Sequence, residues 1–279
     1  MCTERIYSNA VRLTVCVGMA FATSQTSAQQ QPPQPNPATQ QAAATPNAEA
    51  SPEHPLAPAL KYARSSADLL SNVKDFTASF SKQELINGKM VVQQMDIKQR
   101  KEPYSVYIKY KTPATGREVL YVHGQNNNQM LAHETAGLKA MIGTVSLATN
   151  SPMVMEENRY PITMLGMSPL LNNVIRQWEE ETKFGEVDVK FYPDAKLGQI
   201  ACEVIEATHP QPRRQFRFHI TRLYFDKQTH FPIRLEQYAF PQVQGQQPIL
   251  VEEYTFTNIQ TNVNLTEKDF NPKNPAYGF

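Results

Sequence analysis

The feature that most constrains the fold is a period-two alternation of apolar and polar residues, repeated in short segments along most of the chain. Residues 76–80 read Phe, Thr, Ala, Ser, Phe, and residues 87–88 are Asn-Gly, a strong hairpin signal. In a strand, alternate side chains point to opposite faces. Strands joined by short turns pair antiparallel, so the pattern predicts an antiparallel sheet.

Ten segments of this kind are expected to be strands: 76–81, 91–97, 106–110, 119–123, 129–133, 187–192, 198–207, 216–225, 231–240 and 249–259. Helical spacing of apolar residues predicts helices over about 56–73 and 168–183, with a short helical turn at 265–270. A ten-stranded sheet must curl, and two helices are too few to cover both faces. The fold class is therefore mainly β (α+β): a curved antiparallel sheet or incomplete β-barrel, with helices in the concave face.

The N-terminus predicts export. Residues 1–28 have a basic start (Arg5, Arg12), an apolar run over 13–22 and small residues ending at Ala28, as in a signal peptide cleaved near Ala28. The run is about ten residues, and a membrane-spanning helix needs roughly 20. We expect export to the periplasm or cell envelope. An uncleaved anchor, or lipid attachment at Cys16, stays open.

Residues 29–55 are rich in Gln, Pro and Ala and almost lack large apolar side chains. Such a segment cannot bury enough surface to offset its ordering entropy, so we expect a disordered leader, acting either as a tether or simply as a solvated segment. Residues 56–279 then form a single half-barrel domain.

Charge and cysteine content exclude several classes of protein. The chain has 27 Lys and Arg against 26 Asp and Glu, a net charge of +1, which makes nucleic acid a poor partner. Cys202 is the only cysteine after residue 28, so no intrachain disulfide is expected in the mature chain. Glu203 beside it disfavours a reactive thiolate, and we interpret Cys202 as a packing residue.

No catalytic or metal-binding pattern is present in the sequence. It lacks the Gly-x-Ser-x-Gly, P-loop and Gly-x-Gly-x-x-Gly motifs, and His123, His133, His209, His219 and His230 have no partners at metal-ligand spacing. We therefore expect no enzymatic activity, no cofactor and no metal. A hydrolase whose site matches no motif stays open, and it would need titratable groups converging in a pocket.

Alternation also predicts which apolar side chains share one face of the sheet: Met95, Ile97, Val106, Ile108, Leu120, Val122 and Leu235. In a closed sandwich these residues would be packed core, and in an open half-barrel they would line a ligand cavity. The alternation alone leaves both arrangements open.

Six of the ten methionines fall between residues 130 and 167. Met adapts its shape and is common at promiscuous apolar surfaces. One hypothesis is a flap over a cavity, formed by Met153, Met155, Met164 and Met167. The alternative is ordinary core filling beneath an irregular segment.

Two sets of charged residues also allow more than one interpretation. Arg213 and Arg214, with Arg217 nearby, form a basic patch suited to lipid phosphate or an anionic polymer, or merely a soluble loop. Arg217, together with His219, Arg234 and Glu236, is also expected to form cross-strand polar pairs on an outer face.

Several segments resemble the opening strands of the LolA/LolB lipoprotein-carrier superfamily: 76–80 with Gln83 and Glu84, 100–103, 110–113 and 118–124. Residues 224–236 resemble its late hairpin, and residues 60–279 are similar to a bacterial family of exported proteins that carries a domain-of-unknown-function label. The superfamily resemblance implies an incomplete β-barrel closed by helices, with a hydrophobic cavity for acyl chains.

These observations favour an exported, non-enzymatic protein that binds a lipid or other amphiphile in a hydrophobic cavity, possibly as a carrier in the cell envelope. The alternative is a tethered structural or assembly module of the envelope, with a protein partner and no small-molecule ligand. In either case we expect membrane contact to be at most peripheral.

Overall fold

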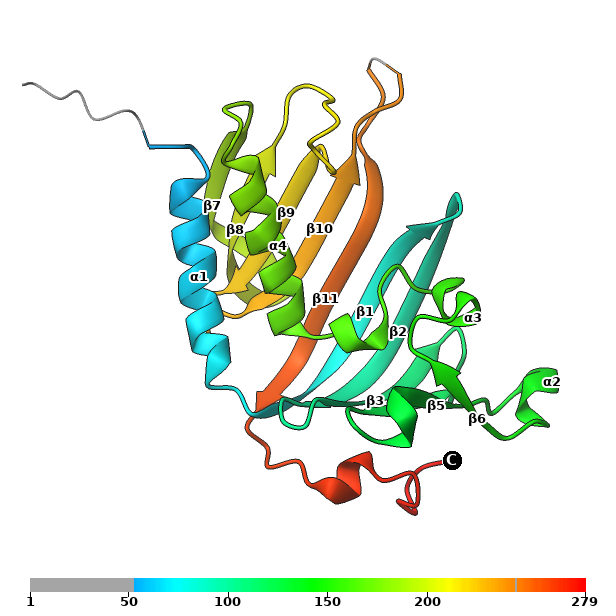
Figure 1. The fold of residues 1–279 in the computed structure, drawn as a ribbon. Helices are drawn as coiled ribbons and strands as arrows, with labels where there is room; N and C mark the ends of the chain where they lie inside the picture. The colour runs from blue at the N-terminus through cyan, green and yellow to red at the C-terminus, as the bar shows by residue number, and fades with distance from the viewer. Residues whose placement is uncertain (1–52, 244) are drawn as a thin grey trace, which may run out of the picture. The chain divides into compact units, whose positions relative to one another are not determined.

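An antiparallel sheet of eleven strands is the framework of the domain (Figure 1). The structure, a computed structural model, describes residues 53–243 and 245–279, the side chains of residues 138 and 139 excepted. The strands are β1 (Asp75–Ile86), β2 (Lys89–Arg100), β3 (Ser105–Thr112), β4 (Glu118–Val122), β5 (Gln129–His133), β6 (Thr144–Ala148), β7 (Asp188–Leu197), β8 (Ile200–Thr208), β9 (Ile220–Asp226), β10 (Pro232–Ala239) and β11 (Ile249–Thr261).

The strand order is β6-β5-β4-β3-β2-β1-β11-β10-β9-β8-β7, so every neighbouring pair except β1 and β11 is also consecutive in the chain. The sheet is curved but not closed, with β6 and β7 as its edges (Figure 1). The predicted fold class, an antiparallel half-barrel, is confirmed. The strand missed by sequence is β6, which alternates only between exposed and half-buried positions. The strand predicted from residue 216 begins at Ile220.

Two helices lie side by side against the half of the sheet formed by β7 to β11 (Figure 1). They are α1 (Ala57–Ser71) and α4 (Met167–Glu181), within two residues of the predicted ranges at either end. Leu60 and Ala63 of α1 and Leu171 and Trp178 of α4 are buried, and all belong to the main core. The amphipathic spacing that predicted each helix therefore marks the side that packs on the sheet.

The remaining elements are short: α2 (Gly137–Ala140), α3 (Pro152–Met155), η1 (Asn126–Asn128), η2 (Ile162–Met164) and η3 (Glu267–Phe270). Residues 152–166, hereafter the covering segment, contain α3 and η2 and cross over β1 and β2 (Figure 1).

The opposite face of β3 and β4 is covered by the C-terminal residues 265–279. Tyr107 and Leu120 pack with Phe270 in a second apolar cluster, and the Tyr107 and Tyr277 rings stack with centroids 4.0 Å apart. All five residues of β4 are consequently buried, because apolar groups cover both of its faces.

The predicted signal peptide, Cys16 and the leader up to residue 52 lie outside the described residues, so these boundaries stay predictions. Among the helices of residues 53–279 that the structure describes, none has both the length and the apolar content needed to cross a bilayer.

Candidate functional site

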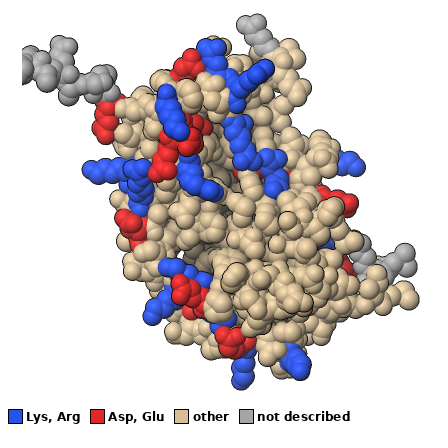
Figure 2. Space-filling model, in the orientation of Figure 1, with Lys and Arg blue, Asp and Glu red and all other residues tan. Residues whose placement is uncertain are grey.

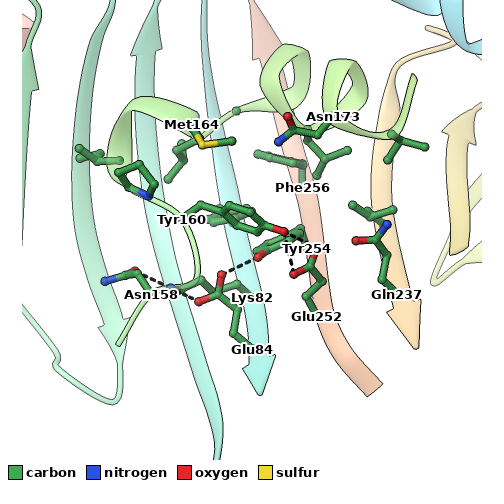
Figure 3. Close-up of a pocket in the computed structure, with 18 of the residues that line it drawn as sticks. Lys82, Glu84, Asn158, Tyr160, Met164, Asn173, Gln237, Glu252, Tyr254 and Phe256 are labelled. Atoms are coloured by element: carbon green, nitrogen blue, oxygen red, sulfur yellow. Dashed lines mark hydrogen bonds and ion pairs between the residues drawn. The ribbon is translucent and has the colours of Figure 1, made fainter. Parts of the chain in front are cut away.

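A cavity of about 760 Å³ lies on the concave side of the sheet, between its strands, α4 and the covering segment (Figure 3). This volume is within the range of roughly 300–1,000 Å³ that small-molecule sites occupy. Strands from both halves of the sheet contribute to its floor, since residues of β1 to β5, β10 and β11 line it.

The floor is largely apolar, although the buried polar side chains of Lys82, Glu84, Gln237 and Glu252 also line it. Its buried aliphatic and phenylalanine residues are Phe80, Met95, Ile108, Val119, Met130, Leu235 and Phe256. At its centre the rings of Phe80 and Phe256, on the neighbouring strands β1 and β11, stack with centroids 4.7 Å apart. The covering segment and α4 add Ile162, Leu165, Leu170 and Val174 from above. Most of the surface offered to a ligand is therefore hydrocarbon.

The pairing register explains which predicted cavity residues reach this floor. Met95, Ile108 and Leu235 line the cavity. Ile97 and Val106 are buried in the same core but do not line it.

Leu120 and Val122 require a correction, because they lie on the other face of the sheet. Ile108 pairs with Val119, and Val106 pairs with Tyr121, so the residues of β4 on the concave side are Val119 and Tyr121. Leu120 and Val122 pack instead in the second cluster under the C-terminal residues.

The four methionines of the predicted flap are dispersed. Met164 lines the cavity, whereas Met167 is buried at the start of α4. Met155 is half-buried against the core and Met153 is 58% exposed. Of the four, only Met164 contributes to the cavity.

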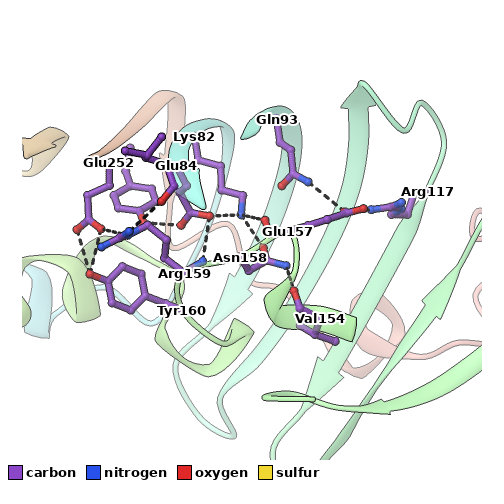
Figure 4. Close-up of polar contacts among 12 residues, drawn as sticks. Lys82, Glu84, Gln93, Arg117, Val154, Glu157, Asn158, Arg159, Tyr160 and Glu252 are labelled. Carbon is purple, nitrogen blue, oxygen red and sulfur yellow. Dashed lines mark hydrogen bonds and ion pairs between the residues drawn. The ribbon is translucent and has the colours of Figure 1, made fainter. Parts of the chain in front are cut away.

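Charged groups hold the covering segment to the sheet at one side of the cavity (Figure 4). Lys82 and Glu84 of β1 form an ion pair at 2.8 Å, with side chains 6% and 2% exposed. The Lys82 ammonium also donates to the backbone carbonyl of Glu157 at 3.0 Å and to Asn158 Oδ1 at 2.5 Å. Burial lowers the pKa of Lys82, and the charge of Glu84 opposes that shift.

A second buried carboxylate, Glu252 of β11, binds the same segment. Arg159 Nε donates to Glu252 at 2.6 Å, and the Tyr160 hydroxyl donates to it at 3.0 Å. Burial raises the pKa of Glu252, which the Arg159 guanidinium partly offsets. Burial together with the Glu252 charge raises the pKa of Tyr160 to about 12. We call Lys82, Glu84, Arg159 and Glu252 the ionic cluster.

Sequence reasoning missed the ionic cluster, although one signal was available. The inward positions of β1 run Phe76, Ala78, Phe80, and the next two inward positions are Lys82 and Glu84. Charges at core-facing positions of an apolar alternation are rarely tolerated without partners, so they point to an internal polar site.

The predicted basic patch divides in two. Arg213 pairs with Glu186 at 3.0 Å on the surface, while Arg217 lines the cavity and donates to the Tyr160 hydroxyl at 3.1 Å. Arg217 therefore joins none of the predicted cross-strand pairs. Arg234 and Glu236 pair with each other along β10 at 2.8 Å, and their cross-strand partners are Glu253 at 2.7 Å and Arg222 at 3.4 Å, not the predicted residues.

Metal-ligating and thiol side chains were the other candidates. Among the described residues of 53–279, no group of three or more metal-ligating side chains occurs. Cys202 is buried, and burial raises the pKa of its thiol. His209 is buried against Glu181, with Nε2 and Oε2 3.2 Å apart, and its ring stacks on Phe216 at a centroid distance of 3.7 Å.

Residues 73–279 match the family described as "Protein of unknown function (DUF1571)". The chain belongs to this family. The predicted similarity to a domain-of-unknown-function family is thereby confirmed over most of the domain. Comparison with curated protein sequences gives no match.

Similar solved structures include a LolA superfamily protein, NE2245, from Nitrosomonas europaea, with 10% identity, coverage of 76% of this chain and 96% of that chain, and a TM-score of 0.31. The lipoprotein LppX from Mycobacterium tuberculosis shares 12% identity, with 75% and 98% covered and a TM-score of 0.44. A chain of the MucA/MucB complex of Pseudomonas aeruginosa shares 16% identity, with 77% of this chain and 61% of that chain covered and a TM-score of 0.43. The predicted resemblance thus has a LolA superfamily member among its matches. At these scores we transfer no function from them.

Proposed function

We propose that this chain is a non-enzymatic binding protein that holds the apolar part of an amphiphile in the concave cavity. The observation that carries the proposal is the cavity floor, where buried apolar side chains from seven strands border a space large enough for a small ligand. Met95, Ile108 and Leu235 are proposed as contacts of the bound chain, together with Val119 and Met130.

The binding energy would come from hydrocarbon burial. Each buried methylene contributes about 0.8 kcal/mol, so a chain of about ten methylenes gives roughly 8 kcal/mol before costs. Lost translational and rotational freedom takes at least about 4 kcal/mol of that. The net of at most about 4 kcal/mol corresponds to an affinity of about millimolar, which suits a protein that must also release its ligand.

Export is the second part of the proposal, and it rests on the signal-like residues 1–28 alone. N-terminal sequencing of the protein recovered from the envelope fraction tests it. We expect the mature chain to begin at Gln29, and a chain that retains residues 1–28 would contradict cleavage.

The cavity is tested with the neutral fluorescent probe N-phenyl-1-naphthylamine and detergent-free mature protein. We expect the probe to bind and dodecanol to displace it. A variant carrying Met95→Trp and Leu235→Trp reduces the cavity volume, so its affinity for the probe should fall at least tenfold. Val92→Trp is the matched control, because Val92 is also on β2 but is 47% exposed and does not line the cavity.

Mass spectrometry of organic extracts from natively purified protein gives the ligand class. A stoichiometric lipid supports the proposal and names that class. If no lipid co-purifies and the probe does not bind, the proposed binding function is wrong, and the tethered assembly module becomes the next hypothesis.

A further inference from the structure

The charged side chains that line the cavity, counted together with their ion-pair partners, include two more cations than carboxylates. Four of them are carboxylates, and each is paired with a cation: Glu84 with Lys82, Glu252 with Arg159, Glu179 with Arg64, and Glu180 with Lys183. The other lining cations are Arg176 and Arg217. Within residues 53–243 and 245–279, neither of these guanidinium groups has a carboxylate partner.

Each arginine is held in place by neutral groups instead. Arg217 donates to the Tyr160 hydroxyl at 3.1 Å, and its guanidinium lies 5.0 Å from the centre of the Phe218 ring. Arg176 donates to the Asn173 side chain one turn earlier on α4. These contacts orient the two side chains, and neither guanidinium forms an ion pair within the described residues, although the charge of Arg217 also acts on Glu252 from a longer distance.

A chain of contacts connects the positions of the two arginines. Gln177, next to Arg176, accepts a hydrogen bond from Gln237 at 2.7 Å, and Gln237 pairs across the sheet with Glu252. Glu252 accepts from Tyr160, which in turn accepts from Arg217. Both arginines are exposed, so this polar end is where the cavity meets solvent. Figure 2 shows Lys and Arg atoms, with Asp and Glu atoms among them, over α4 and the loops above the sheet.

We infer that Arg176 and Arg217 bind the anionic head group, a carboxylate or a phosphate, of the amphiphile whose chain lies on the apolar floor. This inference rests on the proposed function, because it assigns a head group to the same ligand. Guanidinium groups form strong, oriented hydrogen bonds with both kinds of anion. A cationic head group is disfavoured, because the lining carboxylates are already paired with cations.

The test compares three ligands that share a twelve-carbon chain: laurate, dodecyl phosphate and dodecanol. Each displaces N-phenyl-1-naphthylamine from the mature protein at pH 8 and low salt. Laurate and dodecyl phosphate are expected to bind about tenfold more tightly than dodecanol, since two partly exposed charge pairs each add a factor of a few. The tighter of the two anions identifies the head group, and 0.5 M salt should reduce the preference.

The double variant Arg176→Gln/Arg217→Gln should bind all three ligands with the affinity that wild type shows for dodecanol. Arg213→Gln is the matched control, because it lies in the same loop as Arg217 but pairs with Glu186 outside the cavity. It should keep the full preference. Circular dichroism and the melting temperature confirm that each variant folds, and the single variant Arg217→Gln replaces the double one if needed.

Equal affinity for the three ligands in wild type, or a preference that survives in the arginine variants, overturns this inference and leaves the cavity function standing. Failure of all three ligands to bind wild type overturns the proposed function itself.

Discussion

The two halves of the concave face are covered in different ways. On the half formed by β7 to β11, α1 and α4 contribute apolar side chains such as Trp178 to the core that also contains Leu223 and Phe225, all three with no exposed surface. Over β1 and β11, the irregular covering segment is held by ion pairs of the ionic cluster. The two helices pack closely on the concave face of the sheet. The covering segment is attached through a few polar contacts, and the cavity lies beside it.

This difference gives each half its own source of stability. In the packed half, stability comes from many weak contacts between buried side chains. Truncating such a side chain leaves a cavity and lowers the free energy of unfolding. A buried ion pair is costly to desolvate, so it adds little stability overall, but breaking it leaves an uncompensated charge. We therefore interpret the ionic cluster mainly as the device that places residues 157–160 over the cavity.

The largest effect is expected from Trp178→Ala in the packed half. Removing this fully buried indole should lower the free energy of unfolding by about 3–5 kcal/mol, measured by urea denaturation. Leu69→Ala on α1 is the control, because Leu69 is 44% exposed and should change stability by less than about 0.5 kcal/mol. A similar small change for Trp178→Ala would mean that the helices are not tightly packed on the sheet.

In the polar half, Glu84→Gln removes the counterion of a buried ammonium. We expect a loss of about 3 kcal/mol, at the low end for a broken buried pair, because burial already lowers the Lys82 pKa and favours release of its proton. Adding Lys82→Met in the same chain should recover part of the loss. A double variant as unstable as the sum of the single variants would show that the two groups are not coupled.

The junction of the two halves is Gly166, at the N-terminus of α4. Its φ is +118°, and a Cβ there would lie 2.2 Å from Gln99 Oε1. Gly166→Ala should lower stability by about 2 kcal/mol, mostly from backbone strain. Gly185→Ala, beyond the other end of α4, meets no atom within 4 Å and should be neutral in the same thermal-denaturation assay.

The smallest effect concerns a buried pair of the packed half, His209 and Glu181. Burial lowers the His209 pKa, but the adjacent Glu181 carboxylate, the hydrogen bond to the Glu186 carbonyl and the Glu186 charge raise it more, so the net shift is upward. The pair's contribution to stability should be complete below pH about 6.5 and decline as pH rises through the folded pKa. Melting temperatures at several pH values should show this decline in wild type, and a decline just as large in His209→Gln would refute the assignment.

Alternation was a good predictor wherever one face of a strand is apolar and the other polar. It placed Met95 and Ile108 on the concave side and anticipated both long helices. It failed in β4, where residues 119–122 are Val, Leu, Tyr and Val. Because the C-terminal residues cover the second face of this strand, both sets of side chains are apolar, and only the pairing register distinguishes them.

The candidate site was less predictable than the fold, for a related reason. Arg159 and Tyr160 lie in a segment without periodicity, so nothing local indicates that they meet Glu252 about ninety residues later. Arg217 was recognised as part of a basic patch, but its separation from Arg213 depends on the strand starting at Ile220 rather than earlier.

The position of β1 at the centre of the sheet has a consequence for how the chain folds. Its partners are β2, reached through a tight hairpin, and β11, whose Asn258 contacts Ser79 across 179 residues of chain. Closure of so long a loop must precede the gain from that pairing, which favours slow folding. Until β11 pairs with it, β1 has an unpaired edge that can associate with other chains and cause aggregation. We therefore expect the newly synthesised chain to need chaperones, although most of its other strand pairs are local hairpins.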